Sequence, residues 1–425
     1  MRKAQKSRGD KTASEIRART AKVLADRWRS RILMELSAQP LSPTQFVERA
    51  GGELDRIARS FRQLEEWGFI ELVEVRQGRQ TGAALEHVYR RIRRAQLDTQ
   101  AWEELSPDRR DEFTDSNLES YIARINDATE AGTIDAEVDR HLSWDLVLLD
   151  RQAWSWYTTQ LDATMFGLPE LQTEALLRMA KSGEKPIPVT VGLAAFRSPK
   201  RPEAFDSKRP KYSHDPEGMP PSALVISGNA AKAFQSPTRS RIMMELRVRP
   251  MSPTQYVKEV GGSLSYVSRC FRQLAEWGLV EIIARRRNGT RSAAEKVYRS
   301  LEPAHIDTKT WEELPLFVRE EFTASIFSSY LSRITEAINA GTFDADDDRH
   351  FSWDGVSLDR IAWGQLIARL DQLLYGLPRL EREAKKRMAR SDEAPIPTVV
   401  GLAAFRSPLS SEITSKAPRT ARKHS

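Results

Sequence analysis

Arginine residues recur at helical spacing in two short segments of this 425-residue chain. The first segment contains Arg56, Arg59 and Arg62, and the second contains Arg269 and Arg272. A guanidinium group is a planar, always charged donor that pairs well with phosphate oxygens or with the O6 and N7 acceptors of guanine. Residues three positions apart share one face of a helix, so each segment would present a cationic face. This pattern favours binding of a polyanion.

The residue types that other kinds of site require are scarce. Cys270 is the one cysteine of the sequence, which excludes a disulfide scaffold, a structural zinc finger and an iron–sulfur cluster. His141 and His350 have no second histidine or cysteine at ligand spacing, so we expect no metal site. We find no convincing glycine-rich phosphate loop, nucleophile elbow, HExxH motif or carboxylate pair. We therefore expect neither catalysis nor a cofactor.

Charge alternates along the chain, whose net charge is +7. Residues 24–96 and 237–300 carry +3 and +8, whereas residues 97–196 and 301–405 carry −11 and −6. Such alternation is expected where only some parts of a protein meet a polyanion, although uneven charge is also common in soluble proteins. No apolar run reaches 18 residues, and none follows the basic N-terminus. We therefore expect no membrane span, no secretory signal and a cytoplasmic location.

The chain is a tandem duplication with an offset of about 209 residues. Ser42–Gln45 (SPTQ) returns as Ser252–Gln255, and Gly192–Pro199 (GLAAFRSP) returns unchanged as Gly401–Pro408. This period is far longer than solenoid periods, so it indicates two fused, complete units. We expect a basic tail (1–20), a first domain (21–96) with a second half (97–197), a proline-rich charged linker (198–222), the same two parts again (223–300 and 301–407), and a basic tail (408–425).

The first half of each unit predicts three short helices followed by a β-hairpin. In the first unit, the helices are expected at Ala25–Ala38, from Ser42 to about Ala50, and at Leu54–Trp67, and the strands at Phe69–Val75 and His87–Arg91. The third helix is expected to direct inward Leu54, Ile57, Ala58, Phe61 and Leu64, and outward Asp55, Arg56, Arg59, Ser60, Arg62 and Gln63. The second unit repeats this order between residues 240 and 299.

This order and spacing give the outline of a winged helix-turn-helix. Leu41–Leu72 and Met251–Ile282 resemble the ArsR-like winged-helix regulators of prokaryotes, through a capped helix, a turn, an arginine-bearing helix and a Leu-x-x-Trp-Gly segment. The resemblance covers roughly a third of the chain and implies sequence-recognising binding of DNA. Metal sensing is not carried over, because the chain lacks the cysteine or histidine clusters on which it depends.

The resemblance implies DNA contacts from three elements of each unit. Arg59 and Arg269 would contact bases, the arginines one turn further on would contact phosphates, and the hairpin arginines would contact phosphates or the minor groove. Any one surface arginine could instead be only a solvated charge. The second unit lacks the acidic Asp55, so it is expected to bind more tightly. The predicted DNA-binding residues are Thr44, Arg56, Arg59, Arg62, Arg76, Arg79, Thr254, Ser265, Tyr266, Arg269, Arg272, Arg285, Arg286, Arg287 and Arg291.

The second half of each unit predicts a helix, a strand, a helix of about 30 residues interrupted at Gly-Leu-Pro, and a last strand. Two strands make a weak sheet, so we expect the equivalent strands of both units to pair into four. This half loosely resembles the effector or dimerisation region of some ArsR-like proteins. Aromatic residues here could line a small-molecule pocket, although such residues are more often core: Tyr121, Trp144, Trp154, Tyr330, Trp353 and Trp363.

The predicted fold class is thus mainly α with small β (α+β), with two tandem winged helix-turn-helix domains, each followed by a helix-strand-helix-strand domain. The expected function is transcriptional regulation by a single-chain pseudo-dimer that places two helices in successive major grooves, about 34 Å apart. Expected partners are double-stranded DNA and, if the pocket exists, a small-molecule effector; the chain would be a monomer or a homodimer. Two alternatives stay open: a protein-interaction adaptor that does not use DNA, and an enzyme with an unrecognised site.

Overall fold

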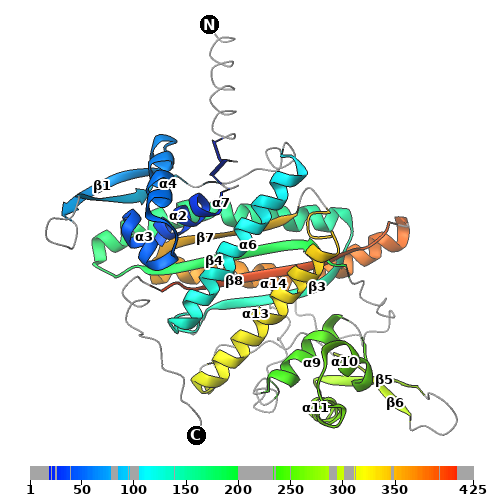
Figure 1. Ribbon diagram of the computed structural model, residues 1–425. Coiled ribbons are helices and arrows are strands. Elements are labelled where there is room, and N and C mark those ends of the chain that lie inside the picture. The colour runs from blue at the N-terminus through cyan, green and yellow to red at the C-terminus, as the bar shows by residue number, and fades with distance from the viewer. Residues whose placement is uncertain are drawn as a thin grey trace.

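The computed structural model has a mixed α and β fold (Figure 1). It describes residues 19–20, 22–23, 26–38, 40–77, 85–93, 95, 105–137, 139–199, 233, 236–248, 250–286, 294–300, 311, 313–345, 349–391 and 393–408. Most of the predicted basic tails, most of the predicted linker and the tips of both hairpins lie outside these ranges. Within them, helices and strands fall within a few residues of their predicted positions.

Module 1 is the first half of the first unit. It consists of α2 (Arg27–Ala38), α3 (Pro43–Ala50), α4 (Leu54–Glu66), β1 (Ile70–Gln77) and β2 (Leu85–Arg91). Ser42 begins α3 with a capping box, in which its hydroxyl accepts the Gln45 N–H at 3.1 Å and its own N–H donates to Gln45 Oε1 at 3.0 Å. Gly51, with φ of 72°, ends α3 and allows the sharp turn into α4.

Module 2 repeats this arrangement in the second unit. It consists of α9 (Pro237–Val248), α10 (Pro253–Val260), α11 (Leu264–Glu276), β5 (Val280–Arg286) and β6 (Glu295–Ser300). In both modules, the residue before the capped helix forms a β-bridge to the second hairpin strand, Leu41 to Tyr89 and Met251 to Tyr298. The hairpin is therefore anchored to the helices in the same way in each copy.

The second halves of the two units share one four-stranded antiparallel sheet. Its strands are β3 (His141–Leu149), β8 (Ile396–Arg406), β4 (Ile187–Arg197) and β7 (His350–Leu358), in that order. The four-stranded sheet was predicted, but only the central β4–β8 pair joins equivalent strands. The outer pairs, β3–β8 and β4–β7, join the first strand of one unit to the last strand of the other. Every ladder of this sheet thus connects the two units, which makes them interlocked.

Helices cover both faces of this sheet (Figure 1). The helices α6 (Pro107–Glu130) and α13 (Leu316–Asn339) lie on one face, and α7 (Arg151–Ser182) and α14 (Arg360–Ser391) lie on the other. Strand β4 serves both cores, since Ala194 and Phe196 pack towards α6 and α13 while Val191 and Ala195 pack towards α7 and α14. The predicted helix of about 30 residues is present in each unit, since α7 and α14 each have 32 residues and continue through Pro169 and Pro378, in the Gly-Leu-Pro segments where a bend was predicted.

Reciprocal ion pairs hold the two units together on the α7 and α14 side. Asp150 caps α7 by accepting the Ala153 N–H at 2.9 Å, and it also accepts from Arg387 Nε of the other unit at 2.5 Å. Asp359 makes the same pair with Arg178, at 2.5 Å. The arginine hydrogen bond is the main cause that lowers the pKa of each carboxyl. These contacts follow the pseudo-two-fold relation of the duplicated units.

The two histidines that the sequence singled out belong to the same interlocked structure. His141 Nδ1 lies 3.0 Å from Asp371 Oδ1, and His350 Nδ1 lies 2.9 Å from Asp162 Oδ1, so each pair joins one unit to the other. Both rings are buried, and their second nitrogens contact a serine hydroxyl two residues further along the same strand. Their role in this structure is to link the units.

Candidate nucleic-acid interface

Helix α4 separates an apolar face from an arginine-bearing face. Ile57, Phe61 and Leu64 are fully buried in the core of module 1. On the opposite side, the predicted arginines 56, 59 and 62 are all exposed. Arg59 Nε donates to the Asp55 carbonyl at 3.3 Å, so its guanidinium group lies along the outer face of its own helix. The cationic face predicted from residue spacing is therefore present on the surface.

Two predicted orientations on α4 are wrong. Leu54 was expected to face inward, but it is 46% exposed, because it is the first residue of the helix and lies beyond the edge of the core. Ser60 was expected to face outward, but it is buried and donates its hydroxyl to the Arg56 carbonyl at 3.1 Å. That bond satisfies the hydroxyl within the helix, so a polar side chain can occupy a core-facing position.

Helix α11 presents a different polar face at the same place in module 2. Ser265, Tyr266, Arg269 and Arg272 are all exposed, and the phenol of Tyr266 lies 3.3 Å from the hydroxyl of Ser236. Cys270 lies on the opposite, buried side of this helix, where burial raises the pKa of its thiol. The cysteine is therefore part of the core and not of the polar face.

Two threonines lie beside the arginine-bearing helices. Thr44 and Thr254 occupy the second position of α3 and of α10, and both are exposed. Because the capping serine accepts only the N–H of the third helical residue in each case, the first turn still presents an exposed threonine hydroxyl and a helix N-terminus. This arrangement suits a phosphate contact of the kind predicted from the sequence.

The hairpin arginines have different surroundings in the two modules. Arg76, a predicted DNA contact, donates from Nε to Glu86 Oε2 at 2.9 Å across the hairpin, and Glu86 also accepts from the Ser42 hydroxyl. The Arg76 side chain is 36% exposed, so part of it stays at the surface of module 1. In module 2, Arg285 is exposed, and Arg286 is the register partner of Glu295. Arg79, Arg287, Arg291 and the side chain of Arg286 lie outside the described residues.

The aromatic residues predicted to line a pocket are core residues. All six are at most 6% exposed, and they pack in the two cores on either side of the sheet. None of them lines the cavity described below. They are Tyr121, Trp144, Trp154, Tyr330, Trp353 and Trp363.

Each module is attached to the layered part, which is the four-stranded sheet with α6, α7, α13 and α14, by a glutamate–arginine pair that is buried in module 1 and partly buried in module 2. Glu35 of α2 lies 3.2 Å from Arg124 of α6, and Glu245 of α9 lies 2.7 Å from Arg333 of α13. The arginine charges lower the pKa of Glu35, against the opposing effect of its complete burial, so the carboxylate form is favoured. These pairs fix α2 and α9, and through them the arginine-bearing helices.

A further ion pair is specific to module 1. Arg91, the last residue of β2, donates to Asp354 Oδ1 of the edge strand β7 at 2.7 Å and to the Gly355 carbonyl at 3.2 Å. Both charged side chains are buried, and Ser300 takes the place of Arg91 in module 2. The two modules are therefore attached unequally to the sheet. This contact was not predicted from the sequence, although the Arg-to-Ser difference between the repeats is visible there.

The described residues provide little for other kinds of site. They contain no group of three or more His, Cys, Asp or Glu side chains that could hold a metal ion. None of their helices combines the length and the apolar character needed to cross a membrane. No protein-family model and no curated protein matches the sequence. The inference of function therefore rests on the geometry of the two modules.

Proposed function

We propose that this chain binds double-stranded DNA through modules 1 and 2, each acting as a winged helix-turn-helix. The observation that carries the proposal is the duplicated geometry of α4 and α11: an apolar face fully buried in the module, a sharp glycine turn before the helix, and an arginine-bearing face left on the surface. The ArsR-like resemblance of the sequence supports the same function.

The proposed contacts follow from the shape and charge of B-form DNA. A single α-helix fits the major groove, and an arginine can donate two hydrogen bonds to guanine O6 and N7. Arg59 and Arg269 lie at the centre of the exposed faces of their helices and would contact bases. Arg62 and Arg272 lie one turn further on and would contact phosphates, together with Thr44 or Thr254.

A single chain with two DNA-binding modules would act as a transcriptional regulator that recognises an asymmetric site. Asp55 and Arg56 of α4 correspond to Ser265 and Tyr266 of α11, so the two helices would prefer different bases. The shared sheet keeps both modules on one molecule, which raises the effective concentration of the second module once the first is bound. Repression by occlusion of a promoter is the role that we favour.

The experiment that tests this proposal is selection of bound fragments from random duplex DNA by the purified protein at physiological salt. We expect an enriched site, and an affinity that falls steeply as salt rises because phosphate contacts release counterions. Arg59→Ala and Arg269→Ala should each reduce discrimination between the selected site and an unrelated duplex by roughly fivefold or more, which corresponds to about 1–3 kcal/mol for a bidentate contact.

Arg379→Ala is a matched control for these substitutions. Arg379 lies on α14, its side chain is 79% exposed, and it pairs with Glu383 at 3.0 Å, so its removal should leave both affinity and discrimination unchanged. Equal loss of affinity for all duplexes in the Arg59 and Arg269 variants would reduce these residues to phosphate contacts. Absence of binding to every duplex at low salt would refute the proposal and favour a protein-interaction role.

A further inference from the structure

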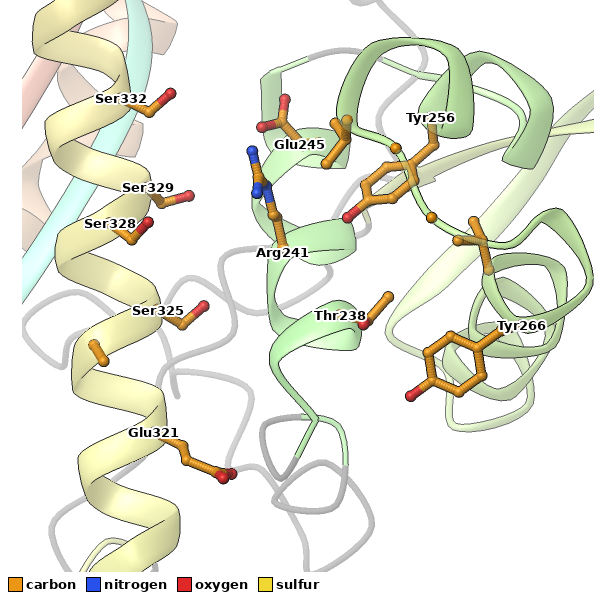
Figure 2. Close-up of a pocket in the computed structure, with 15 residues that line it drawn as sticks. Thr238, Arg241, Glu245, Tyr256, Tyr266, Glu321, Ser325, Ser328, Ser329 and Ser332 are labelled. Atoms are coloured by element: carbon orange, nitrogen blue, oxygen red, sulfur yellow. The ribbon is translucent and has the colours of Figure 1, made fainter. Parts of the chain in front are cut away.

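Module 2 contains a cavity of about 480 Å³ where α9, α10 and α11 approach α13 (Figure 2). Its volume lies in the range of small-molecule sites. Thr238, Tyr256, Gly262 and Tyr266 line it from module 2, and a row of α13 serines lines it from the layered part: Ser325, Ser328, Ser329 and Ser332. The walls therefore combine aromatic rings with hydroxyl groups, and they also contain the charged side chains of Arg241, Glu245 and Glu321.

In module 1, a tryptophan occupies the equivalent space. Trp28, the counterpart of Thr238, packs edge-on against Phe46 with ring centroids 6.3 Å apart. It lies so close to Gly52 that a Cβ on this glycine would be 2.9 Å from Trp28 Cη2. Trp28 is only 9% exposed, so its indole ring fills the space between α2 and the α3–α4 turn.

In module 2, the same backbone is present without the filling side chain. Gly262 has φ of 102°, against 103° for Gly52, but a Cβ on Gly262 would meet only Val267, at 3.5 Å. Phe46 is replaced by Tyr256, which adds a hydroxyl group at the cavity. The small side chain of Thr238 therefore leaves open the space that the indole ring of Trp28 fills in module 1.

We propose that this cavity is a binding site for a small planar aromatic molecule of about the size of indole that also carries hydrogen-bonding groups. Its ring would pack against Tyr256 and above Gly262, as the Trp28 ring packs against Phe46 and Gly52. Its polar edge would meet the hydroxyl groups of Thr238 and of the α13 serines, which Figure 2 shows facing module 2. This site does not depend on the proposed DNA binding.

Ligand-observed NMR of the full chain with indole as the probe, in the absence of DNA, tests the proposal. The wild-type protein should give a binding signal, and Thr238→Trp, which inserts the side chain that module 1 has, should weaken binding at least tenfold. Thr173→Trp is the matched control, since Thr173 is exposed on α7, lies outside both modules and does not line the cavity; this variant should bind indole like the wild type.

Trp28→Thr provides a second, independent measurement. In the Thr238→Trp background it should restore the indole signal, because it opens the same space in module 1. A Thr238→Trp variant that binds indole as strongly as the wild type would overturn the proposal. The proposal would also be overturned if the wild-type protein gave no indole binding signal under conditions in which the Trp28→Thr, Thr238→Trp double variant gave one. Circular dichroism spectra that match the wild type would show that each variant is folded.

Discussion

The centre of the interlocked sheet provides a sharp test of the architecture that holds the two modules. Gly192 of β4 lies beneath the ring of Tyr121 from α6, and a Cβ at this position would be 2.3 Å from Tyr121 Oη and 2.6 Å from Cζ. Tyr121 is 2% exposed and contacts Phe351 and Trp353, so its ring cannot move aside. Gly192→Ala should therefore lower the free energy of unfolding by about 1–3 kcal/mol, the usual range for overpacking.

Urea unfolding followed by far-UV circular dichroism measures this effect, and Gly167→Ala is the matched control. Gly167 is exposed within α7, and nothing lies within 4 Å of a Cβ built there, so alanine should stabilise the helix by about 0.5–1 kcal/mol. Adding Tyr121→Phe to Gly192→Ala should recover only part of the loss, because Cζ still lies too close. An unfolding free energy of Gly192→Ala equal to or above that of the wild type would refute the packing argument.

Two further predictions concern ion pairs of the interlocked structure. Arg91→Ser should destabilise the protein by about 3 kcal/mol in urea unfolding, because it removes the buried ion pair between Arg91 and Asp354. Ser300→Arg should not destabilise it in this way, and equal effects of the two variants would contradict the unequal attachment of the modules. The pKa of Asp150 is lowered in the folded state, so its pair with Arg387 stabilises the protein above the carboxyl's ordinary pKa of about 4 and is lost as pH falls through the lower folded value. As pH is lowered, the melting temperature should therefore fall less steeply for Asp150→Asn than for the wild type. Identical pH profiles of the two proteins would contradict this role.

The local elements could be predicted because their signals are local. Ser42 with Gln45 predicts a capped helix start, and the structure contains the full capping box. The spacing of Ile57, Phe61 and Leu64 predicts the buried face of α4, and thereby the exposed arginines opposite it. The burial of a side chain at the end of a helix is not set by residue spacing alone. Leu54 was therefore predicted wrongly, because its burial depends on where the core of module 1 ends.

Contacts between distant residues could not be predicted in this way. The partner of Arg76 is Glu86, and only the register of the hairpin brings the two side chains together. The absence of a tryptophan at Thr238 is visible in the repeat, but the cavity that results depends on the packing of module 2 against α13. The burial of the aromatic residues in the sheet cores likewise follows from the four layered helices, which no single segment specifies.

The sequence by itself determined the duplication, the order of helices and strands in each unit, and the cationic helix faces, because repeats, caps and hydrophobic periodicity are written in neighbouring residues. Only the tertiary structure decided that β3 pairs with β8 and β7 with β4, so that no strand of the central sheet pairs within its own unit. The two copies have nearly identical strands, and either pairing would satisfy their backbone hydrogen bonds. The observed pairing lets the helices of one unit pack on strands of the other, as α7 does on β7 and α14 on β3.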